Sequence, residues 1–459
     1  MSKSLFKEFE AVSSKAWKQK IQVDLKGADY NDELIWKTNE DINVKPFYHA
    51  DEFETLAEVS NSKATQWKIS QYIVVTNAEN ANLKAIDAIN RGAESIFFKI
   101  TSRDISAEIL FQNIDLSKTN INVICSFLSE DYIKNLLSEV NYKTELPKIT
   151  IHTDIIGNLA KTGNWYKSLN DDYKIFENII NTTQQLSVDL SLYQNAGATI
   201  VQQLAYGLAH VNEYLNHFEA SKNSNLNNIT VTFNIAVGGN YFFEIAKTRA
   251  LRQLWSTLAA AYNLKTECNI IATPSKRNKT IYDYNVNMLR TTTECMSAIL
   301  GGANIICNQP YDAIFHKSNE FGDRIARNQL LILKNESYFN KVNNPADGAY
   351  YIESLTTQLA EKALEIFKNI EANGGFLSQL KTGTIQRKIK ESASKEQTEF
   401  DAEKLILLGT NKYPNALDKM KDNLEISPFL KIEKRKTLIE PIIKKRLSEK
   451  LENKRLNQE

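Results

Sequence analysis

Residues 285–307 read NVNMLRTTTECMSAILGGANIIC and hold the transition that decides the fold. The stretch from Asn285 to Leu300 is expected to be a helix, and Ala303–Cys307 is a short strand-forming run. Gly301 and Gly302 stand between them, where a helix ends best on a residue that tolerates the left-handed conformation. A helix that passes into a strand through two glycines predicts a repeating β/α unit.

The same alternation extends over Ala64 to Asn335, where short β-branched runs alternate with longer amphipathic segments. This pattern is expected when crossover helices join parallel strands. In Thr199–Ala220, the apolar residues recur on one helical stripe suited to cover a sheet. About eight strands are expected, the number that closes a TIM (β/α)8 barrel of the α/β class. The expected strands are Trp67–Val75, Ser95–Ile100, Ile121–Leu128, Lys148–Thr153, Leu186–Ser191, Asn228–Ala236, Cys268–Thr273 and Ala303–Cys307.

Four regions are expected along the chain. Residues 1–63 lack lasting periodicity and are interpreted as an extended N-terminal arm, and residues 64–335 hold the barrel. Residues 336–430 extend the barrel, and the lysine-rich residues 431–459 are predicted to form a solvated, charged helical tail. Nucleic acid is an alternative ligand for that tail, but its lysines and arginines are mixed with glutamates, so the net field is modest.

The amino-acid composition is typical of a globular protein and excludes several other classes. The chain has 459 residues, 42% of them hydrophobic and 24% charged, which excludes disorder and a small disulfide scaffold. Its 56 basic and 55 acidic residues provide no broad attraction to nucleic acid or to an anionic membrane. No stretch approaches ~20 apolar residues and the start lacks the apolar centre of a signal peptide, so we expect a soluble cytoplasmic protein. Four cysteines without a CxxC pair are expected to be free thiols.

Reacting groups of a barrel lie at the C-terminal ends of its strands. Those positions show no His, Asp and Glu cluster suited to a divalent metal, and no GxxxxGK[ST] or GxGxxG motif occurs. His152 and Asp154 share one strand end and are a candidate pair. His210 and His217 lie seven residues apart on one helical face, where a ligand pair and a half-buried helix surface are the alternatives.

Two loop motifs are candidate anion sites. Gly238 and Gly239 precede a predicted helix, which makes them a weak candidate for an anion nest. Lys276, Arg277 and Lys279 follow the seventh predicted strand, where an anionic group or bulk solvent would face them.

Six blocks, in order, resemble the methylmalonyl-CoA mutases, adenosylcobalamin enzymes whose acyl-CoA domain is a TIM barrel. The ordered set is more specific than any single block and covers about residues 51–413. The blocks are Trp67–Tyr72 (WKISQY), Gln194–Ala198 (QNAGA), Asn240–Ala250 (NYFFEIAKTRA) running to Trp255, Arg290–Glu294 (RTTTE) running to Leu300–Gly302 (LGG), Arg324–Asn328 (RIARN) and Asn344–Glu353 (NPADGAYYIE). The arm, with Trp17 and Asp24–Gly27 (DLKG), is similar to that of the family's small subunit, which pairs with a catalytic large subunit.

The chain departs from the family pattern at residues that carry out the family's chemistry. In the catalytic subunit a cobalamin-binding domain ligates cobalt through a D-x-H-x-x-G histidine, and no histidine here has that context, so no such domain is expected. The resemblance places Leu192 at the histidine that hydrogen-bonds the thioester carbonyl and Cys307 at another active-site histidine. Leucine has no donor and a neutral thiol is a weak one, so polarisation of the carbonyl would be lost.

Three further positions also lack the charged residue that the family has there. Ser70 and Thr162 stand where the family has arginines, and Asn195 stands where it has a glutamate. Tyr72 matches the tyrosine that contacts substrate and cofactor. It is the one substrate-binding residue that the resemblance implies, with an inherited packing role as the alternative, and no catalytic residue is expected.

The resemblance therefore implies a non-catalytic beta subunit of methylmalonyl-CoA mutase, which interconverts succinyl-CoA and (R)-methylmalonyl-CoA by radical isomerisation. A catalytic large (alpha) subunit would hold adenosylcobalamin, acyl-CoA would bind in the complex, and this chain would bind no cofactor or metal. The alternative is an active acyl-CoA-binding barrel that uses a separate cobalamin-domain polypeptide. In the arm, Trp17, Trp36, Phe47 and Tyr48 are candidates for contact with the partner or for burial within this chain.

Overall fold

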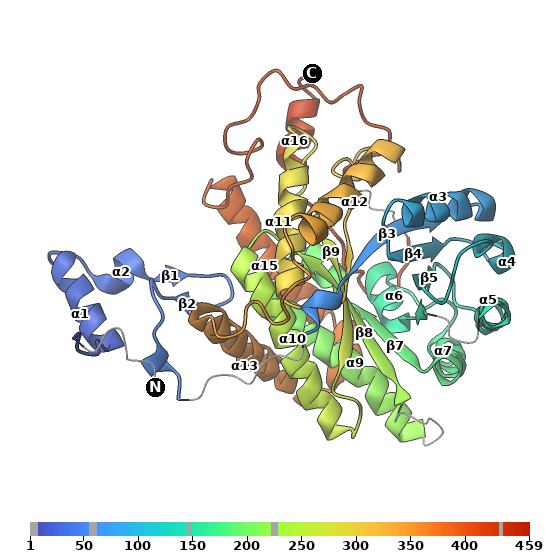
Figure 1. The fold of residues 1–459 in the computed structure, drawn as a ribbon, viewed down its shortest axis with the longest axis horizontal. Coiled ribbons are helices and arrows are strands. Elements are labelled where there is room, and N and C mark those ends of the chain that lie inside the picture. Colours follow the sequence, from blue (N-terminus) through green and yellow to red (C-terminus); the bar gives the residue numbers. More distant parts are fainter. Residues whose placement is uncertain (1–7, 55–61, 145–147, 222–227, 431–434) are drawn as a thin grey trace.

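The computed structural model describes residues 8–54, 62–144, 148–221, 228–430 and 435–459. Eight parallel strands form one sheet in the order β6-β5-β4-β3-β10-β9-β8-β7, surrounded by helices (Figure 1). The strands are β3 (Lys68–Val75), β4 (Ser95–Ile100), β5 (Asn120–Cys125), β6 (Ile149–His152), β7 (Gln185–Asp189), β8 (Thr230–Val237), β9 (Cys268–Pro274) and β10 (Ile305–Cys307). All eight predicted strands are present, and the TIM barrel is confirmed.

Side chains close the barrel between its terminal strands, β6 and β7. Gln185, the first residue of β7, uses its amide in place of a backbone ladder. Its Oε1 accepts from the Ile151 amide at 2.6 Å, and its Nε2 donates to the Ile149 carbonyl at 2.8 Å. The Asp189 amide at the other end of β7 donates to Asp154 Oδ2 at 2.9 Å.

The helices that cover the barrel alternate with its strands. They are α3 (Ala78–Asn90), α4 (Ala107–Leu110), α5 (Glu130–Lys143), α6 (Ile155–Thr162), α7 (Leu169–Thr183), α8 (Ser191–Ala196), α9 (Ile200–Ser221), α10 (Tyr241–Ala261), α11 (Val286–Leu300) and α12 (Glu320–Asn335). The predicted stripe of α9, from Ile200 to Phe218, is buried against the sheet. Gly302 ends the turn after α11 with φ 85°, a conformation that glycine adopts without strain.

The chain after the barrel packs onto it and does not stand in solvent. This part contains α13 (Tyr350–Ala372), α14 (Gly375–Lys381), α15 (Thr384–Asp401) and α16 (Glu449–Leu456). Part of the tail prediction was wrong: among the described residues of the tail only α16 is helical, and Arg446 and Glu452 are buried as an ion pair at 2.7 Å. The many charged residues of the tail indicated exposure to solvent, whereas Arg446 and Glu452 are buried by pairing with each other. Residues 431–434 of that prediction lie outside the described residues.

The arm stands to one side of the barrel (Figure 1). It contains α1 (Ser14–Asp24), α2 (Tyr30–Leu34), the antiparallel strands β1 (Trp36–Lys37) and β2 (Asn43–Val44), and two short 3-10 helices, η1 (Ala50–Glu52) and η2 (Ala64–Gln66). Its second half docks on the barrel, because the Glu40 carboxylate accepts from the Ile200 and Val201 amides at the start of α9, at 2.7 and 2.8 Å. No residue of α1 is buried. Among the described residues, no helix is long and apolar enough to cross a membrane.

Candidate functional site

The interior of the barrel holds a chain of neutral polar side chains. Alternate residues of a strand point to the same face, which places Ser70, Ser95, Asn122 and His152 inside together with Asn234. The Ser70 hydroxyl donates to Ser95 Oγ at 3.3 Å, and Asn122 Nδ2 donates to the same oxygen at 3.1 Å. His152 continues the chain, with Nε2 3.1 Å from Asn122 Oδ1 and Nδ1 3.4 Å from Asn234 Nδ2. These groups contact one another across five strands, β3, β4, β5, β6 and β8.

His152 is held as a neutral imidazole. Burial lowers the pKa of its ring to about 3. Its Nε2 faces the carbonyl oxygen of Asn122 and its Nδ1 faces the amide nitrogen of Asn234, so only the Nε2–H tautomer satisfies both contacts. The imidazole is therefore occupied by the interior chain.

An aromatic stack connects Tyr72 to His152 through Phe97. Tyr72 lies 5.6 Å from Phe97 between ring centroids, and Phe97 lies 5.1 Å from His152. Tyr72 keeps 42% of its surface exposed, yet burial of its hydroxyl, with Cys307 and Asp189 nearby, raises its pKa. Tyr72 is thus the exposed end of the stack.

The two positions that the resemblance ties to lost histidines are both buried. Leu192 lies in α8 with 2% of its surface exposed. Cys307 ends β10 inside the barrel, where burial raises the pKa of its thiol to about 12 and a hydrogen bond with Ser70 opposes that rise. A leucine and an un-ionised thiol offer weak donors at most to a thioester oxygen.

The other departures are engaged in local contacts. Thr162 Oγ1 donates to the carbonyl of Asn158 at 2.8 Å, one turn earlier in α6. Asn195 Nδ2 donates to the Ser191 carbonyl at 2.8 Å, and its Oδ1 accepts from the Lys276 amide at 2.8 Å. Each side chain stabilises a loop of the barrel mouth.

The prediction that His152 and Asp154 form a pair is wrong, because β6 ends at His152 and the two side chains have different partners. His152 points into the barrel, whereas Asp154 caps α6 and lies 2.9 Å from His210 Nε2. Tyr214 donates to the same carboxylate oxygen at 2.7 Å, and Tyr193 OH lies 2.9 Å from His210 Nδ1. Burial opposes the ionisation of Asp154, but His210, the Asp189 amide and Tyr214 together lower its pKa. The sequence did not predict this cluster, because its members lie far apart along the chain.

His210 and His217 do not form a ligand pair. His210 is fully buried in the Asp154 cluster. His217 is half-buried and pairs with Glu177 through Nε2 at 2.6 Å. The two rings have different partners although they share a helix face.

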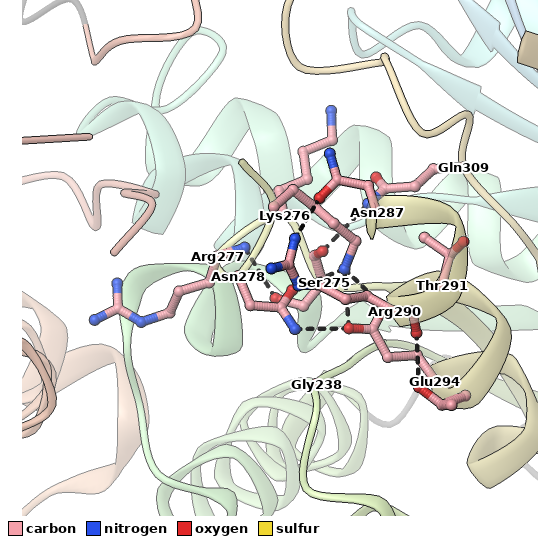
Figure 2. A network of polar contacts seen from close by, with 12 residues as sticks. Gly238, Ser275, Lys276, Arg277, Asn278, Asn287, Arg290, Thr291, Glu294 and Gln309 are labelled. Carbon is pink, nitrogen blue, oxygen red and sulfur yellow. Dashed lines mark hydrogen bonds and ion pairs between the residues drawn. The ribbon is translucent and has the colours of Figure 1, made fainter. Parts of the chain in front are cut away.

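The three basic residues after β9 separate into two environments. Lys279 pairs with Glu294 at 2.7 Å, and both are buried. Figure 2 shows Glu294 in the polar network of this loop, where it also accepts from Asn278 Nδ2 at 2.7 Å. Arg277 is also buried and pairs with Glu396 at 2.6 Å. Lys276 alone is exposed, at the mouth. Two of the three cations are structural.

The Gly238–Gly239 segment is no anion nest. The Gly238 amide donates to Glu244 Oε1 at 2.9 Å. Glu244 is buried and also pairs with Lys247 at 2.5 Å. An acidic side chain of the protein thus occupies that amide.

Each histidine of the described residues has a hydrogen-bond or ion-pair partner within the chain. The described residues contain no group of three or more His, Cys, Asp or Glu that could hold a metal ion. His152 is the one histidine within the barrel interior they form, and both of its ring nitrogens are engaged. A segment of the tail also lies across the mouth, where the Ile442 amide donates to the Ala160 carbonyl at 2.7 Å.

Comparison with known proteins identifies the family of this chain. Residues 99–458 match the sequence profile of the methylmalonyl-CoA mutase family. The chain is 33% identical over 92% of its length to the methylmalonyl-CoA mutase small subunit of Porphyromonas gingivalis, of which it covers 73%. The chain belongs to the methylmalonyl-CoA mutase family.

Other members of the family are also similar to the chain. It is 28% identical to the methylmalonyl-CoA mutase of Rhizobium meliloti over 90% of its own length and 64% of that protein. It is 27% identical to the large subunit from Porphyromonas gingivalis over 85% of its own length and 62% of that subunit. The chain thus spans less than two thirds of these two relatives.

Proposed function

We propose that this chain is the non-catalytic small (beta) subunit of an adenosylcobalamin-dependent methylmalonyl-CoA mutase. A catalytic large (alpha) subunit would hold the cofactor and the acyl-CoA, and would interconvert succinyl-CoA and (R)-methylmalonyl-CoA. The observation that carries the proposal is the state of Leu192 and Cys307, which are both buried and lack a strong hydrogen-bond donor.

The physical argument concerns charge that develops on the thioester oxygen. Polarisation of a carbonyl requires donors preorganised at that oxygen, and removal of one such donor commonly costs about 10²–10³ in rate. Leu192 supplies none, and the Cys307 thiol is engaged with Ser70. His152 cannot substitute without breaking its bonds to Asn122 and Asn234.

Tyr72 is the one position that keeps the family's substrate-contacting residue. Its side chain keeps 42% of its surface exposed. We interpret it mainly as the end of the Phe97 stack, whose ring centroid lies 5.6 Å away. Loss of its hydroxyl should therefore leave turnover of the complex nearly unchanged.

The first helix of the arm is the proposed contact with the large subunit. Trp17 is 51% exposed, and its one ring contact among the described residues is the edge of Phe47 at 6.2 Å. The rest of the arm is used within the chain, since Trp36 packs on Phe243 and Tyr48 on Tyr351. A helix that stands off the barrel with exposed apolar residues is suited to bury them against a partner.

The test is to purify the chain alone and with a co-expressed large subunit, and to measure mutase turnover and cobalamin content of each. The proposal expects turnover and cobalamin only in the preparation that contains the large subunit. Turnover by this barrel after addition of a separate cobalamin-domain polypeptide, without a large subunit, would instead establish an active acyl-CoA-binding barrel.

A pair of variants tests the arm. Trp17→Glu should weaken co-purification with the large subunit, because it places a charge on the proposed contact. Tyr142→Glu is the matched control, since Tyr142 is 90% exposed on α5 of the barrel. Equal recovery of the large subunit with both variants would contradict the assignment of α1.

A further inference from the structure

A cavity of about 350 Å³ lies between α15 and the tail. One wall is a single face of α15, on which Gln386, Ile389, Ala393 and Gln397 follow one another at helical spacing. A rise of about 1.5 Å per residue puts about 16 Å between the first and the last of these residues. A volume of this size is typical of sites for small molecules, and its length suits an extended ligand.

The tail forms the opposite wall, and hydrogen bonds hold it in place beside α15. Gln386 Nε2 donates to the Glu440 carbonyl at 2.9 Å at one end, and Gln397 Nε2 donates to the Leu447 carbonyl at 3.3 Å at the other. Between these anchors, the Ile442 amide donates to the Ala160 carbonyl of α6 at 2.7 Å. Residues 441–443 therefore cannot move onto α15 and fill the cavity without breaking a bond to the barrel.

Most of the surface of the cavity is apolar. Its apolar residues come from three segments, α8, α15 and the tail, and include Ala196, Ile389, Ala393, Pro441, Ile442 and Ile443. Apolar walls stabilise a ligand in proportion to the apolar area that the ligand removes from water. We therefore expect the body of the ligand to be aliphatic.

The charged residues give the cavity one uncompensated positive charge. Arg277, Lys390 and Lys445 line it, and no carboxylate of the described residues does. Glu396 pairs with Arg277 at 2.6 Å, and Glu440 pairs with Lys390. Of the three cations, Lys445 alone forms no ion pair within the described part of the chain. Its ammonium group is therefore available to one anionic group of a ligand.

Gln386 determines the direction in which such a ligand lies. Its side chain is only 2% exposed, and its Oε1 has no hydrogen-bond partner among the described residues. A carboxylate beside this oxygen would bring two acceptors together, which is unfavourable. Lys445 lies toward the other end, where Arg277 Nη1 donates to its carbonyl at 2.8 Å. The anionic group is therefore expected near Lys445, with the aliphatic body along α15 toward Gln386.

We propose that the cavity between α15 and the tail binds a medium-chain aliphatic monocarboxylate. One carboxylate matches the one uncompensated cation, Lys445, with which it forms a charge-assisted hydrogen bond. The aliphatic chain matches the apolar walls, and the length of about 16 Å along α15 suits a medium chain. The site does not depend on the proposed subunit role, because none of these residues belongs to the positions that the mutase reaction requires.

The test is calorimetric titration of the full chain with hexanoate, octanoate and decanoate. We expect saturable binding of one molecule per chain, which becomes about fourfold tighter for each methylene added. Decanol has the same chain as decanoate without the charge, and it should bind about tenfold more weakly. Absence of saturable binding of decanoate at millimolar concentration, or equal affinity for decanol, would overturn the proposal.

Two pairs of variants locate the site. Lys445→Gln should weaken decanoate binding about tenfold, whereas Lys444→Gln, at the neighbouring exposed lysine outside the cavity, should not. Ser394→Phe fills the cavity and should abolish binding, whereas Lys395→Phe, at the next exposed position of α15, should not.

Thermal unfolding separates loss of the site from loss of the fold. All four variants change exposed side chains, so without ligand they should melt close to the unmodified chain. Decanoate should raise the melting temperature of Lys444→Gln and Lys395→Phe more than that of Lys445→Gln and Ser394→Phe. Equal binding by the two members of either pair would overturn the site.

Discussion

Lys276 and Lys279 lie three residues apart on the loop after β9, in contrasting surroundings. Lys279 is buried and paired with Glu294 at 2.7 Å. Lys276 is exposed instead, and among the described residues no carboxylate forms an ion pair with it. The charge of Lys279 is neutralised by an ion pair that anchors the loop, whereas the charge of Lys276 has no such partner among the described residues. The contrast separates a lysine that stabilises the loop from a lysine that contributes little to stability.

Breaking the buried pair should have the largest effect. Glu294→Gln leaves the Lys279 ammonium buried without a counter-charge, which should lower the free energy of unfolding by about 3–5 kcal/mol. Urea denaturation measures this loss. Glu440→Gln is the control, because it breaks an exposed pair with Lys390 and should cost at most about 1 kcal/mol. Equal losses would contradict the structural role of the network.

The sequence predicted the framework of the barrel because its signals are local. β-Branched runs indicated all eight strands, and the stripe of Thr199–Ala220 indicated α9, since burial of one face imposes a period on neighbouring residues. The path of residues 435–447 across the mouth was not predicted. Its anchors, such as Ile442 to Ala160, are single hydrogen bonds to distant loops and leave no period in the sequence.

Acid should weaken the barrel interior through His152. Because burial lowers the pKa of its ring from 6.5 to about 3, the unfolded chain binds a proton in this range that the folded chain does not. This contribution to stability is fully present above pH 6.5 and is lost as the pH falls toward 3, with a slope of up to about 1.4 kcal/mol per pH unit.

Urea denaturation between pH 4 and 7 checks this slope. His152→Asn should reduce it, whereas His49→Asn, at a half-exposed ring of the arm, should not. An unchanged slope in His152→Asn would show that the folded barrel accepts the proton.

Neighbouring residues of the β9 loop sharpen the comparison at smaller scale. Arg277→Gln removes a buried cation that pairs with Glu396 and donates to the Lys445 carbonyl, and should cost about 1–3 kcal/mol. Lys276→Gln should change stability by less than about 0.5 kcal/mol, because the side chain is exposed and no carboxylate of the described residues pairs with it. Chemical denaturation of both variants measures the difference. A larger loss for Lys276→Gln would contradict the assignment of the two environments.

The smallest effect is expected at Tyr72. Tyr72→Phe keeps the stack on Phe97 and removes only the hydroxyl, so mutase turnover of the complex should stay within about twofold. Steady-state kinetics of the co-purified complex checks this, with unmodified complex as reference. A tenfold or larger loss would show that this barrel contacts substrate.

The candidate site was predictable only where chemistry follows from residue identity. The side chain of Leu192 has no hydrogen-bond donor whatever its surroundings, so the loss of a donor at this position was predictable from the sequence. The partners of His210, Lys279 and Arg277 were not predictable. Asp154, Glu294 and Glu396 lie on other elements, and the choice among many acids was set by packing in three dimensions.

Mutase turnover, measured on this chain alone and on its complex with the large subunit, tests the central claim most directly. The account predicts no interconversion of succinyl-CoA and methylmalonyl-CoA by the isolated chain supplied with adenosylcobalamin, and full activity in the complex. Turnover by the isolated chain would contradict it.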